Sequence, residues 1–469
     1  MDFFNDVSYF SDNTAITAED GKNITYAEMI GNADKINAEI PSRSLVFLVC
    51  ENCPESITAY IGFLRKKVVP VLINPKIDNS MLTLLLDAYK PQYIFCRKDW
   101  HADGLEVTEF GTHHLLKTEN YTAPEMNSEL AVLITTSGST GSPKLVMQSY
   151  KNIISNANSI AEYLNIVEDD RAITTMPMSY TYGLSIIQSH LLKGARIIAT
   201  EKTLMDKEFW NLLKEQRATT FGGVPYTYEM LKRLRFGRMD LPSLKYITQA
   251  GGKLSKEMAL EFSEICRDKG IKLIIMYGQT EATARMAYLP WEHAFTKAGS
   301  IGIAIPGGKL YLVDAKEKVI DQPETVGEMV YEGDNVTLGY ALTKSDLAKS
   351  DERHGKLQTG DMAKFDADGF FTIVGRKKRF LKIFGNRVNL DEIEGILNKE
   401  GYKCICGGRD DLLKIYMVNA DEKSLSAVID FISGKVGLNR SAFRSVSIDE
   451  IPRNDSGKVL YSKLEELYD

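Results

Sequence analysis

The sequence has few cysteines and no excess of positive charge, and both absences narrow the possible functions. Six cysteines among 469 residues are too few for a disulfide scaffold; they stand at positions 50, 53, 96, 266, 404 and 406. The close pairs Cys50/Cys53 and Cys404/Cys406 lie far apart in the chain, so we expect buried free thiols rather than a zinc or redox site. The net charge of −6 is unlike that of a dedicated nucleic-acid binder.

The sequence also lacks long apolar runs, and we expect no leader segment. No run approaches the roughly 18 apolar residues that span a bilayer. The start, residues 1–7, lacks a positive segment followed by an apolar one, so no signal peptide is predicted. We therefore expect no membrane partner and a cytoplasmic location. The chain is too long for a single hydrophobic core, and its composition, 44% hydrophobic and 26% charged, is that of a multidomain globular protein.

Short apolar runs rich in β-branched residues alternate with helical patterns over the first 300 residues. The clearest runs, residues 45–49, 68–73, 93–96, 130–135 and 196–199, are predicted strands. Helical patterns lie between them, for example over residues 55–66 and 151–164. This alternation is typical of βαβ units, and it predicts an α/β fold with a large N-terminal domain of mostly parallel sheets covered by helices.

The pattern changes near residue 300, where glycine, aspartate and short β runs become frequent. Runs at 309–313, 327–331 and 370–374 predict a β-rich subdomain over about 300–376, which completes a large domain of residues 1–376. The polar segment 375–379 marks a joint, and residues 377–469 are predicted to form a small, mobile α+β domain. Asp391 is expected to begin a helix there, because acidic residues favour a first helical turn.

One segment has the composition of a loop that binds polyphosphate. Residues 135–144 read Thr-Thr-Ser-Gly-Ser-Thr-Gly-Ser-Pro-Lys, between a predicted strand and a helix. Its glycines allow tight turns, so several backbone N–H groups can point at one anion, and Lys144 adds positive charge. The segment lacks the Gly-Lys-Ser/Thr ending of a P-loop. Taken alone, it leaves open an ordinary Ser/Gly-rich surface loop.

Further motifs follow this loop in a fixed order. They are Tyr277-Gly-Gln-Thr-Glu281, Thr359-Gly-Asp361, a long segment from Gly375 to Glu394, and Pro452-Arg-Asn-Asp-Ser-Gly-Lys458; Ile24-Thr-Tyr-Ala-Glu28 precedes them. Together they resemble the adenylate-forming superfamily of acyl- and aryl-CoA synthetases, peptide-synthetase adenylation domains and luciferases. The resemblance runs from about residue 10 to the C-terminus. It implies a ligase that forms acyl-AMP and pyrophosphate from ATP and a carboxylic acid, then passes the acyl group to a thiol, with CoA as the expected acceptor.

The resemblance also implies where the nucleotide binds. The β- and γ-phosphates are expected at the loop, on Thr136, Ser137, Gly138, Ser139, Thr140, Gly141 and Lys144. Gly251 and Gly252 would let the backbone approach the adenine, against which Tyr277 would pack, next to Gly278 and Gln279. Without the resemblance, a Gly-Gly pair is an ordinary turn.

Two acidic residues carry implied roles toward the metal and the ribose. Thr280 would contact the α-phosphate and Glu281 would bind Mg²⁺, a cation that takes only one or two protein carboxylates when phosphates are present. Asp361 would accept hydrogen bonds from the ribose hydroxyls, since a carboxylate is a strong double acceptor. Arg376 would reinforce ribose or phosphate binding.

Lys458 is the expected catalytic residue. In the first half-reaction two anions react, and a cation between them removes repulsion and stabilises the charge that develops. The resemblance places a hinge at Lys378 and implies that the small domain rotates there between half-reactions. The second orientation would bring Lys382 and Gly385 toward the incoming thiol.

The sequence departs from the family pattern at two places, one in the segment where the acid should bind and one in the hinge segment. The segment Pro177–Gly183 carries Tyr180 where many members have His, and Arg379 stands where an acidic residue is usual. We expect a mixed aromatic and small lining, suited to a medium-sized or aryl acid. This set, which we name the predicted acid-binding cluster, comprises Tyr180, Tyr182, Gly183, Gly223, Val224 and Pro225.

Other functions stay open at this point. The acyl group could pass to a carrier protein or an amine instead of CoA, although we expect no carrier segment after Lys458. A nucleotide-binding protein without catalysis is disfavoured, because Lys458, Glu281 and Asp361 are all present. An ordinary phosphate-loop NTPase would release ADP and phosphate rather than AMP and pyrophosphate.

Overall fold

The computed structural model describes residues 7–119, 122–135, 144–384, 386–453, 459–461 and 463–464. By the contacts of its backbone, the chain divides into two compact units. The first contains residues 1–309 and 332–357, and the second contains residues 310–331 and 358–469. The second unit thus includes part of the segment that the sequence assigns to the large domain, and the predicted boundary at residue 376 stays a prediction.

The first unit contains a nine-stranded sheet that is parallel at its centre and antiparallel at both edges. In spatial order its strands are β16 (Ile303–Ala304), β15 (Ala287–Leu289), β14 (Lys272–Tyr277), β13 (Tyr246–Gln249), β12 (Thr220–Gly223), β10 (Arg171–Ile173), β11 (Arg196–Ile198), β1 (Thr14–Thr17) and β2 (Asn23–Thr25).

An eight-stranded sheet completes this unit, with parallel pairing among β8, β4, β3 and β5 and antiparallel pairing outside them. Its order is β20 (Gly339–Ala341), β9 (Leu145–Ser149), β8 (Leu130–Thr135), β4 (Val69–Ile73), β3 (Leu45–Val49), β5 (Tyr93–Arg97), β7 (His113–Lys117) and β6 (Leu105–Phe110).

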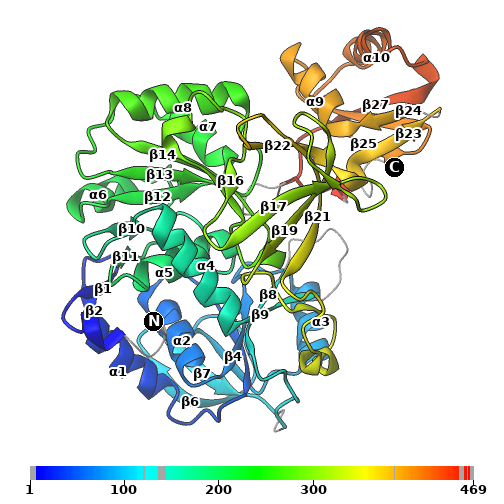
Figure 1. Ribbon diagram of the computed structural model, residues 1–469. Helices are drawn as coiled ribbons and strands as arrows, with labels where there is room; N and C mark the ends of the chain where they lie inside the picture. The colour runs from blue at the N-terminus through cyan, green and yellow to red at the C-terminus, as the bar shows by residue number, and fades with distance from the viewer. Residues whose placement is uncertain are drawn as a thin grey trace. The chain divides into compact units, whose positions relative to one another are not determined.

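Helices separate and cover the two sheets. Figure 1 shows α4 and α5 between them, and one hydrophobic core joins side chains of both sheets to these inner helices. The helices of this unit are α1 (Tyr26–Ile36), α2 (Pro54–Arg65), α3 (Asn79–Tyr89), α4 (Tyr150–Tyr163), α5 (Thr181–Leu191), α6 (Lys207–Glu215), α7 (Pro225–Arg233) and α8 (Lys256–Asp268).

Burial on both faces explains why the central strands read as unbroken apolar runs. In β3, Val46 and Leu48 belong to the core between the sheets, whereas Leu45, Phe47 and Val49 pack into a second core that includes residues of α3. The predicted strands at 45–49, 68–73, 93–96, 130–135 and 196–199 correspond to β3, β4, β5, β8 and β11. The predicted helices at 55–66 and 151–164 correspond to α2 and α4.

The second unit contains most of a five-stranded sheet and an α+β segment. The five-stranded sheet has the order β18 (Val319–Ile320), β17 (Gly308–Val313), β19 (Gly327–Gly333), β21 (Lys356–Phe365) and β22 (Phe371–Arg376). The remaining elements are β23 (Phe380–Ile383), β24 (Asn386–Asn389), α9 (Leu390–Lys399), β25 (Cys404–Arg409), β26 (Leu412–Val418), α10 (Glu422–Val436) and β27 (Phe443–Ile448). Short 3₁₀ turns in the chain are η1 (Val7–Phe10), η2 (Phe236–Arg238), η3 (Thr280–Ala282), η4 (Trp291–His293), η5 (Lys344–Ala348), η6 (Lys377–Arg379) and η7 (Arg440–Ala442).

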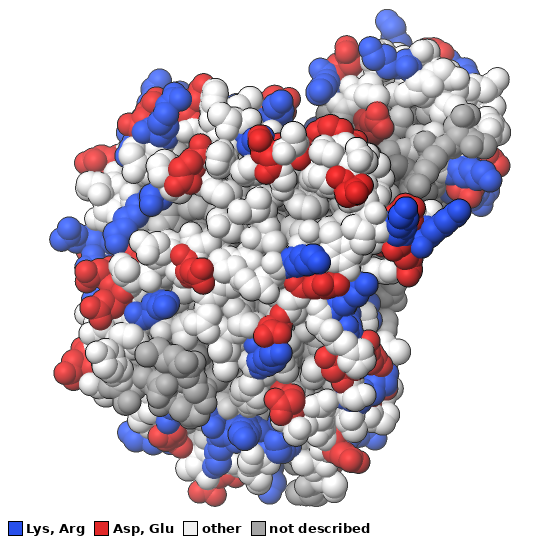
Figure 2. All heavy atoms as spheres, in the orientation of Figure 1, with Lys and Arg blue, Asp and Glu red and all other residues white. Residues whose placement is uncertain are grey.

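Three smaller expectations can be compared with the structure. The helix expected at Asp391 begins one residue earlier, because the Asn389 side chain accepts a hydrogen bond from the Asp391 N–H and caps it. The six cysteines are free thiols, and all but Cys53 are buried. Within the described residues, no helix combines the length and apolarity that a membrane crossing requires. On the face in Figure 2, basic and acidic side chains are interspersed.

Helix α5 is buried along its whole length, yet it carries His190. The His190 Nδ1 lies 2.8 Å from the Ile186 carbonyl oxygen, which can only accept, so Nδ1 carries the proton. Nε2 then accepts from the Tyr246 hydroxyl at 3.1 Å. The pKa of His190 is lowered to about 4, chiefly by burial; the Arg285 cation acts in the same direction, whereas the hydrogen bond to Ile186 and the Asp170 charge act against it.

The buried His190 predicts a loss of stability in mild acid. Its pKa is about 6.5 in the unfolded chain and about 4 in the fold, so between these values the unfolded state binds more protons. Stability is therefore lost as pH falls from 6.5 to 4, by roughly 3 kcal/mol. Urea unfolding across this range should show a shallower pH dependence for His190→Gln than for the wild type. The exposed substitution His101→Gln should keep the wild-type slope; equal slopes for all three proteins would contradict the assignment.

Candidate active site

The predicted site residues of the first unit gather where the parallel strands end. Tyr180 and Gly183 begin α5 after β10, Gly223 ends β12, Gly251 follows β13, and Tyr277 ends β14. The carboxyl ends of neighbouring parallel strands meet at one edge of a sheet, which is where open α/β sheets bind ligands. The predicted acid-binding cluster and the residues predicted to bind adenine therefore lie at the same edge of the nine-stranded sheet, although their strands are distant in the sequence.

Close packing joins these residues to one another. Gly251 has a φ of +79°, and a Cβ atom there would lie 2.6 Å from the Tyr180 hydroxyl and 3.0 Å from Val224. The Tyr182 hydroxyl lies 2.8 Å from the Thr248 hydroxyl and accepts from the Gly223 N–H at 3.3 Å. Gly251 is therefore required by the close approach of Tyr180, whereas a Cβ atom at Gly223 would lie 2.7 Å from the Thr227 side chain. Pro225 packs in the same way against Gly252.

The segment from Gly278 to Met286, named here the β14–β15 loop, holds the predicted phosphate and metal residues. A Cβ atom at Gly278 would overlap the Ala284 carbonyl oxygen, so only glycine fits where the loop crosses itself. Thr283 has a φ of +67°, a conformation rare for a β-branched residue. Strain of this kind persists only where surrounding contacts impose it, and it concentrates at functional sites.

Hydrogen bonds impose this conformation from outside the loop. The Asn335 side chain donates to the Ala282 carbonyl at 2.9 Å and to the Arg285 carbonyl at 3.1 Å. The Asn156 side chain, from α4, donates to the Arg285 carbonyl at 2.8 Å. Thr283 in turn donates from its hydroxyl to the Asn335 carbonyl at 2.7 Å. The loop is thus fixed before any ligand binds.

Tyr340 connects the predicted metal ligand to the phosphate loop. Its hydroxyl donates to the Glu281 carboxylate at 2.7 Å. The Lys144 ammonium lies 4.0 Å from the centre of the Tyr340 ring, and the Arg353 guanidinium lies 4.6 Å from it. Arg353 also donates to the Glu281 carbonyl at 2.9 Å. Two cations and one carboxylate therefore converge on a single aromatic ring.

This arrangement fits the implied magnesium ion. Glu281 is partly exposed, and within the described part of the chain its carboxylate bonds only to Tyr340. A single oriented carboxylate suits Mg²⁺, which keeps several waters and takes its remaining ligands from phosphates. Burial raises the pKa of Tyr340 to about 12, and the Glu281 charge acts in the same direction, so the hydroxyl stays a donor at neutral pH.

The second unit holds the predicted ribose residues. Asp361, in β21, is buried, and its carboxylate pairs with the Arg376 Nε at 2.7 Å from the neighbouring strand β22. The Arg376 side chain is half-exposed. The Thr359 hydroxyl accepts from the Asp361 N–H at 3.1 Å and donates to the Met329 carbonyl at 2.7 Å, which fixes the turn. The structure thus joins two residues that the sequence assigns to one task.

Arg379, the unusual residue in the hinge segment, is the centre of an ion-pair network. Its guanidinium lies 2.5 Å from Asp391 and 2.5 Å from Glu394, and it stacks over Tyr461 at 4.1 Å. Its neighbour Lys377 pairs with Glu328 at 2.7 Å. The Lys382 side chain is exposed. These contacts give Arg379 a structural role within its unit.

Several sequence-predicted residues lie outside the described residues. They are Thr136, Ser137, Gly138, Ser139, Thr140, Gly141, Gly385 and Lys458. Conversely, the sequence analysis missed Tyr340 and Arg353, because neither stands in a motif. Tyr340 is placed by the pairing of β20 with β9, and Arg353 lies between η5 and β21; a single sequence reveals neither position.

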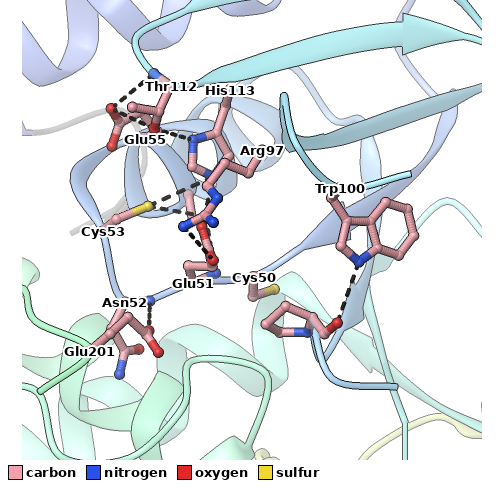
Figure 3. A network of polar contacts seen from close by, with 12 residues as sticks. Cys50, Glu51, Asn52, Cys53, Glu55, Arg97, Trp100, Thr112, His113 and Glu201 are labelled. Atoms are coloured by element: carbon pink, nitrogen blue, oxygen red, sulfur yellow. Dashed lines mark hydrogen bonds and ion pairs between the residues drawn. The ribbon is translucent and has the colours of Figure 1, made fainter. Parts of the chain in front are cut away.

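A second polar cluster follows the carboxyl end of β3 and contains none of the predicted site residues. Figure 3 shows Glu51, Cys53, Arg97 and His113, whose potential metal ligands Glu51, Cys53 and His113 lie within 4.8 Å of one another. Glu51 already pairs with His113 at 3.5 Å and with Arg97 at 3.6 Å. The hydrogen bond from His113 is the main cause that lowers the pKa of Glu51, and burial raises the pKa of the Cys53 thiol to about 12. A charge-paired structural network explains the cluster.

Comparison with known proteins identifies what the fold and the site resemble. The model of the AMP-binding enzyme family matches residues 3–341. The 2-succinylbenzoate–CoA ligase of Bacillus cereus (strain Q1) is 27% identical over 475 residues, which cover 97% of this chain and 96% of that protein.

Two solved structures share the fold. O-succinylbenzoate coenzyme A synthetase (MenE) from Bacillus subtilis, in complex with ATP and magnesium ion, superposes with a TM-score of 0.80 at 21% identity, covering 99% of both chains. ATP-bound MatB from Rhodopseudomonas palustris superposes with a TM-score of 0.79 at 21% identity, covering 99% of this chain and 98% of that one. The predicted α/β fold class is confirmed.

The contact between Tyr340 and Glu281 predicts a change in magnesium dependence. Tyr340→Phe keeps the ring under Lys144 and Arg353 but removes the hydroxyl that orients the Glu281 carboxylate. Loss of such a partner typically weakens metal affinity about 10- to 100-fold. We therefore expect a rise of about 10-fold in the Mg²⁺ concentration that half-saturates ATP-dependent turnover. Tyr9→Phe changes an exposed side chain and is the control. An unchanged Mg²⁺ requirement in Tyr340→Phe would contradict the assignment of Glu281 as the metal ligand.

Proposed function

The chain belongs to the AMP-binding enzyme family, and from this premise we propose that it activates a carboxylic acid with ATP and transfers the acyl group to the thiol of CoA. The class of enzyme predicted from the sequence, an AMP-forming acid–thiol ligase, agrees with the family and with the ligases it resembles over nearly its whole length. The roles of individual residues remain proposals.

The observation that carries the proposal is the convergence on Tyr340. Lys144 closes the segment with polyphosphate-binding composition, and Glu281 closes the motif after β14. Both lie against the same side chain, through a cation–π contact and a hydrogen bond. A phosphate-binding cation and a metal-binding carboxylate are needed side by side when a nucleoside triphosphate is held with its metal.

In the first half-reaction, a carboxylate oxygen of the acid attacks the α-phosphorus of ATP. The bond from that phosphorus to the oxygen bridging to the β-phosphate breaks, and pyrophosphate leaves with the electron pair. Thr280 is proposed to orient the α-phosphate by hydrogen bonding, and Lys458 to place positive charge between the two anions. Magnesium, when bound, supplies positive charge to the phosphates, and Glu281 would hold it. No nucleophile from the protein is required.

In the second half-reaction, the thiol of the acceptor gives up its proton and its sulfur attacks the acyl carbonyl carbon. The carbon–oxygen bond to AMP breaks, and AMP leaves with the oxygen that came from the acid. CoA is the proposed acceptor because 2-succinylbenzoate–CoA ligases align with 97% of the chain. A carrier-protein thiol or an amine would use the same acyl-AMP.

Exchange of labelled pyrophosphate into ATP tests the first half-reaction directly. A panel of short, long and aromatic acids, including 2-succinylbenzoate, should contain a class that supports exchange. Lys458→Ala should reduce this exchange by a factor on the order of 10² to 10³, because it removes a cation that stabilises transition-state charge. Lys423→Ala, at an exposed position in α10, should leave the exchange unchanged.

Other outcomes identify the alternatives. Release of ADP and phosphate in place of AMP and pyrophosphate would contradict adenylation. ATP binding without exchange for any acid would point to a nucleotide-binding protein without catalysis. If an acid supports pyrophosphate exchange but no CoA thioester forms, the acceptor would be a carrier-protein thiol or an amine.

A further inference from the structure

A buried arginine behind the predicted acid-binding cluster has no counter-charge among the described residues. Arg285 is 2% exposed and heads the group of largest fully buried side chains. Its Nε donates to the Ser185 hydroxyl, and its Nη1 donates to the Tyr163 hydroxyl and the Met276 sulfur, each at 3.1 Å. All three partners are neutral. Within the part of the chain that the structure describes, the guanidinium makes no ion pair and Nη2 makes no hydrogen bond.

The groups around Arg285 do not supply the missing negative charge. Asp170 acts electrostatically on the neighbouring His190 and Tyr246, but its own carboxylate pairs with Lys245 at 2.7 Å. His190 is neutral above mild acid, as shown above. Buried charges in proteins are normally paired, because taking a charge out of water without a partner is strongly unfavourable. An unpaired guanidinium at this depth therefore points to a ligand that brings the charge.

The location of Arg285 connects it to the acid. Its guanidinium lies 5.3 Å from the centre of the Tyr182 ring, and the Tyr182 hydroxyl contacts the Gly223 N–H. Both tyrosine and glycine belong to the predicted acid-binding cluster. Arg285 also lies in the same strained β14–β15 loop that carries Thr280 and Glu281, with its backbone fixed by Asn156 and Asn335. The cation is therefore held in place before substrate binds.

Helix α5 gives the spacing between the two ends of the acid. The Thr181 hydroxyl lies 3.5 Å from the Thr280 hydroxyl, where the reacting carboxylate is proposed to meet the α-phosphate. Ser185, four residues further along α5, contacts Arg285. Four residues of helix rise roughly 6 Å. A second anionic group at Arg285 would thus sit a few carbons away from the reacting carboxylate.

We propose that Arg285 binds a second carboxylate of the substrate, and that the enzyme activates one carboxyl group of a compact dicarboxylic acid. This inference rests on the proposed ligase function and specifies its substrate class. One guanidinium balances one carboxylate, and its planar donors match the two carboxylate oxygens. The neutral surroundings of Arg285 make the pairing selective, because an acid with an uncharged tail would leave the cation buried and unpaired.

Matched pairs of acids test the assignment. Pyrophosphate exchange is measured with succinate, glutarate, adipate and 2-succinylbenzoate, each beside an amide that lacks the second charge. For the best substrate pair, the wild type should have a kcat/KM for the diacid that is roughly 100-fold or more above that for the amide, which is the usual effect of losing one partner of a buried charge pair. Arg285→Met should remove most of this preference, and Arg285→Lys should restore part of it.

Tyr163→Phe is the matched control, because it removes one hydrogen bond from the guanidinium and leaves its charge. This variant should keep the ratio of diacid to amide, whereas a purely structural Arg285 would change both acids alike. Melting temperatures of all variants confirm folding. A wild type that prefers monocarboxylic acids, or an unchanged ratio in a folded Arg285→Met, would overturn the assignment while leaving the ligase function intact.

A measurement of diacid binding tests the role of Arg285 independently of the ligase function. Without exchange for any acid, the ligase proposal fails, and thermal stabilisation by the diacids alone decides the role of Arg285. Stabilisation of the wild type and Tyr163→Phe, but not of Arg285→Met, would support the anion site. Equal stabilisation of all three, or of none, would overturn it.

Discussion

The strained β14–β15 loop is the constraint on which the candidate site depends. Its conformation requires glycine at position 278 and a positive φ at Thr283. An isolated loop would not adopt such a conformation. Asn156 from α4 and Asn335 before β20 hold it through its backbone carbonyls. Elements from across the first unit thus fix the position of Thr280, Glu281 and Arg285 together. Preorganisation of this kind lets polar groups act on a ligand without reorganising as charge develops.

The same loop holds both the residues proposed to bind the reacting groups and the residue proposed to select the acid. Thr280 and Glu281 lie at one end of the loop and Arg285 at the other, while α5 runs alongside with Thr181 and Ser185 facing the two ends. A substrate that reaches both ends is held in one direction, with one carboxyl at the phosphate and the other at the guanidinium. Binding energy from the distant carboxylate then positions the reacting one, which is how remote contacts increase rate.

The sequence predicted those features that depend on local pattern. β3 and β4 were recognisable because both faces are buried, and Glu281 and Asp361 because they stand in ordered motifs. Tyr340 and Arg353 were not, since both reach Glu281 through contacts between residues far apart in the sequence. Arg285 reads in the sequence as an ordinary charged loop residue, and only the fold shows that it is buried. Lys458 and residues 136–141 lie outside the described residues, so their roles rest on the motifs.

The fate of the acid's oxygen tests the central claim, activation as an acyl-AMP. An acid labelled with ¹⁸O in its carboxylate is turned over once with ATP and CoA, and the products are analysed by mass spectrometry. Attack on the α-phosphorus followed by thioester formation transfers one labelled oxygen to AMP. The account predicts AMP with one heavy oxygen and unlabelled pyrophosphate. Label in inorganic phosphate, with ADP as the nucleotide product, would contradict it.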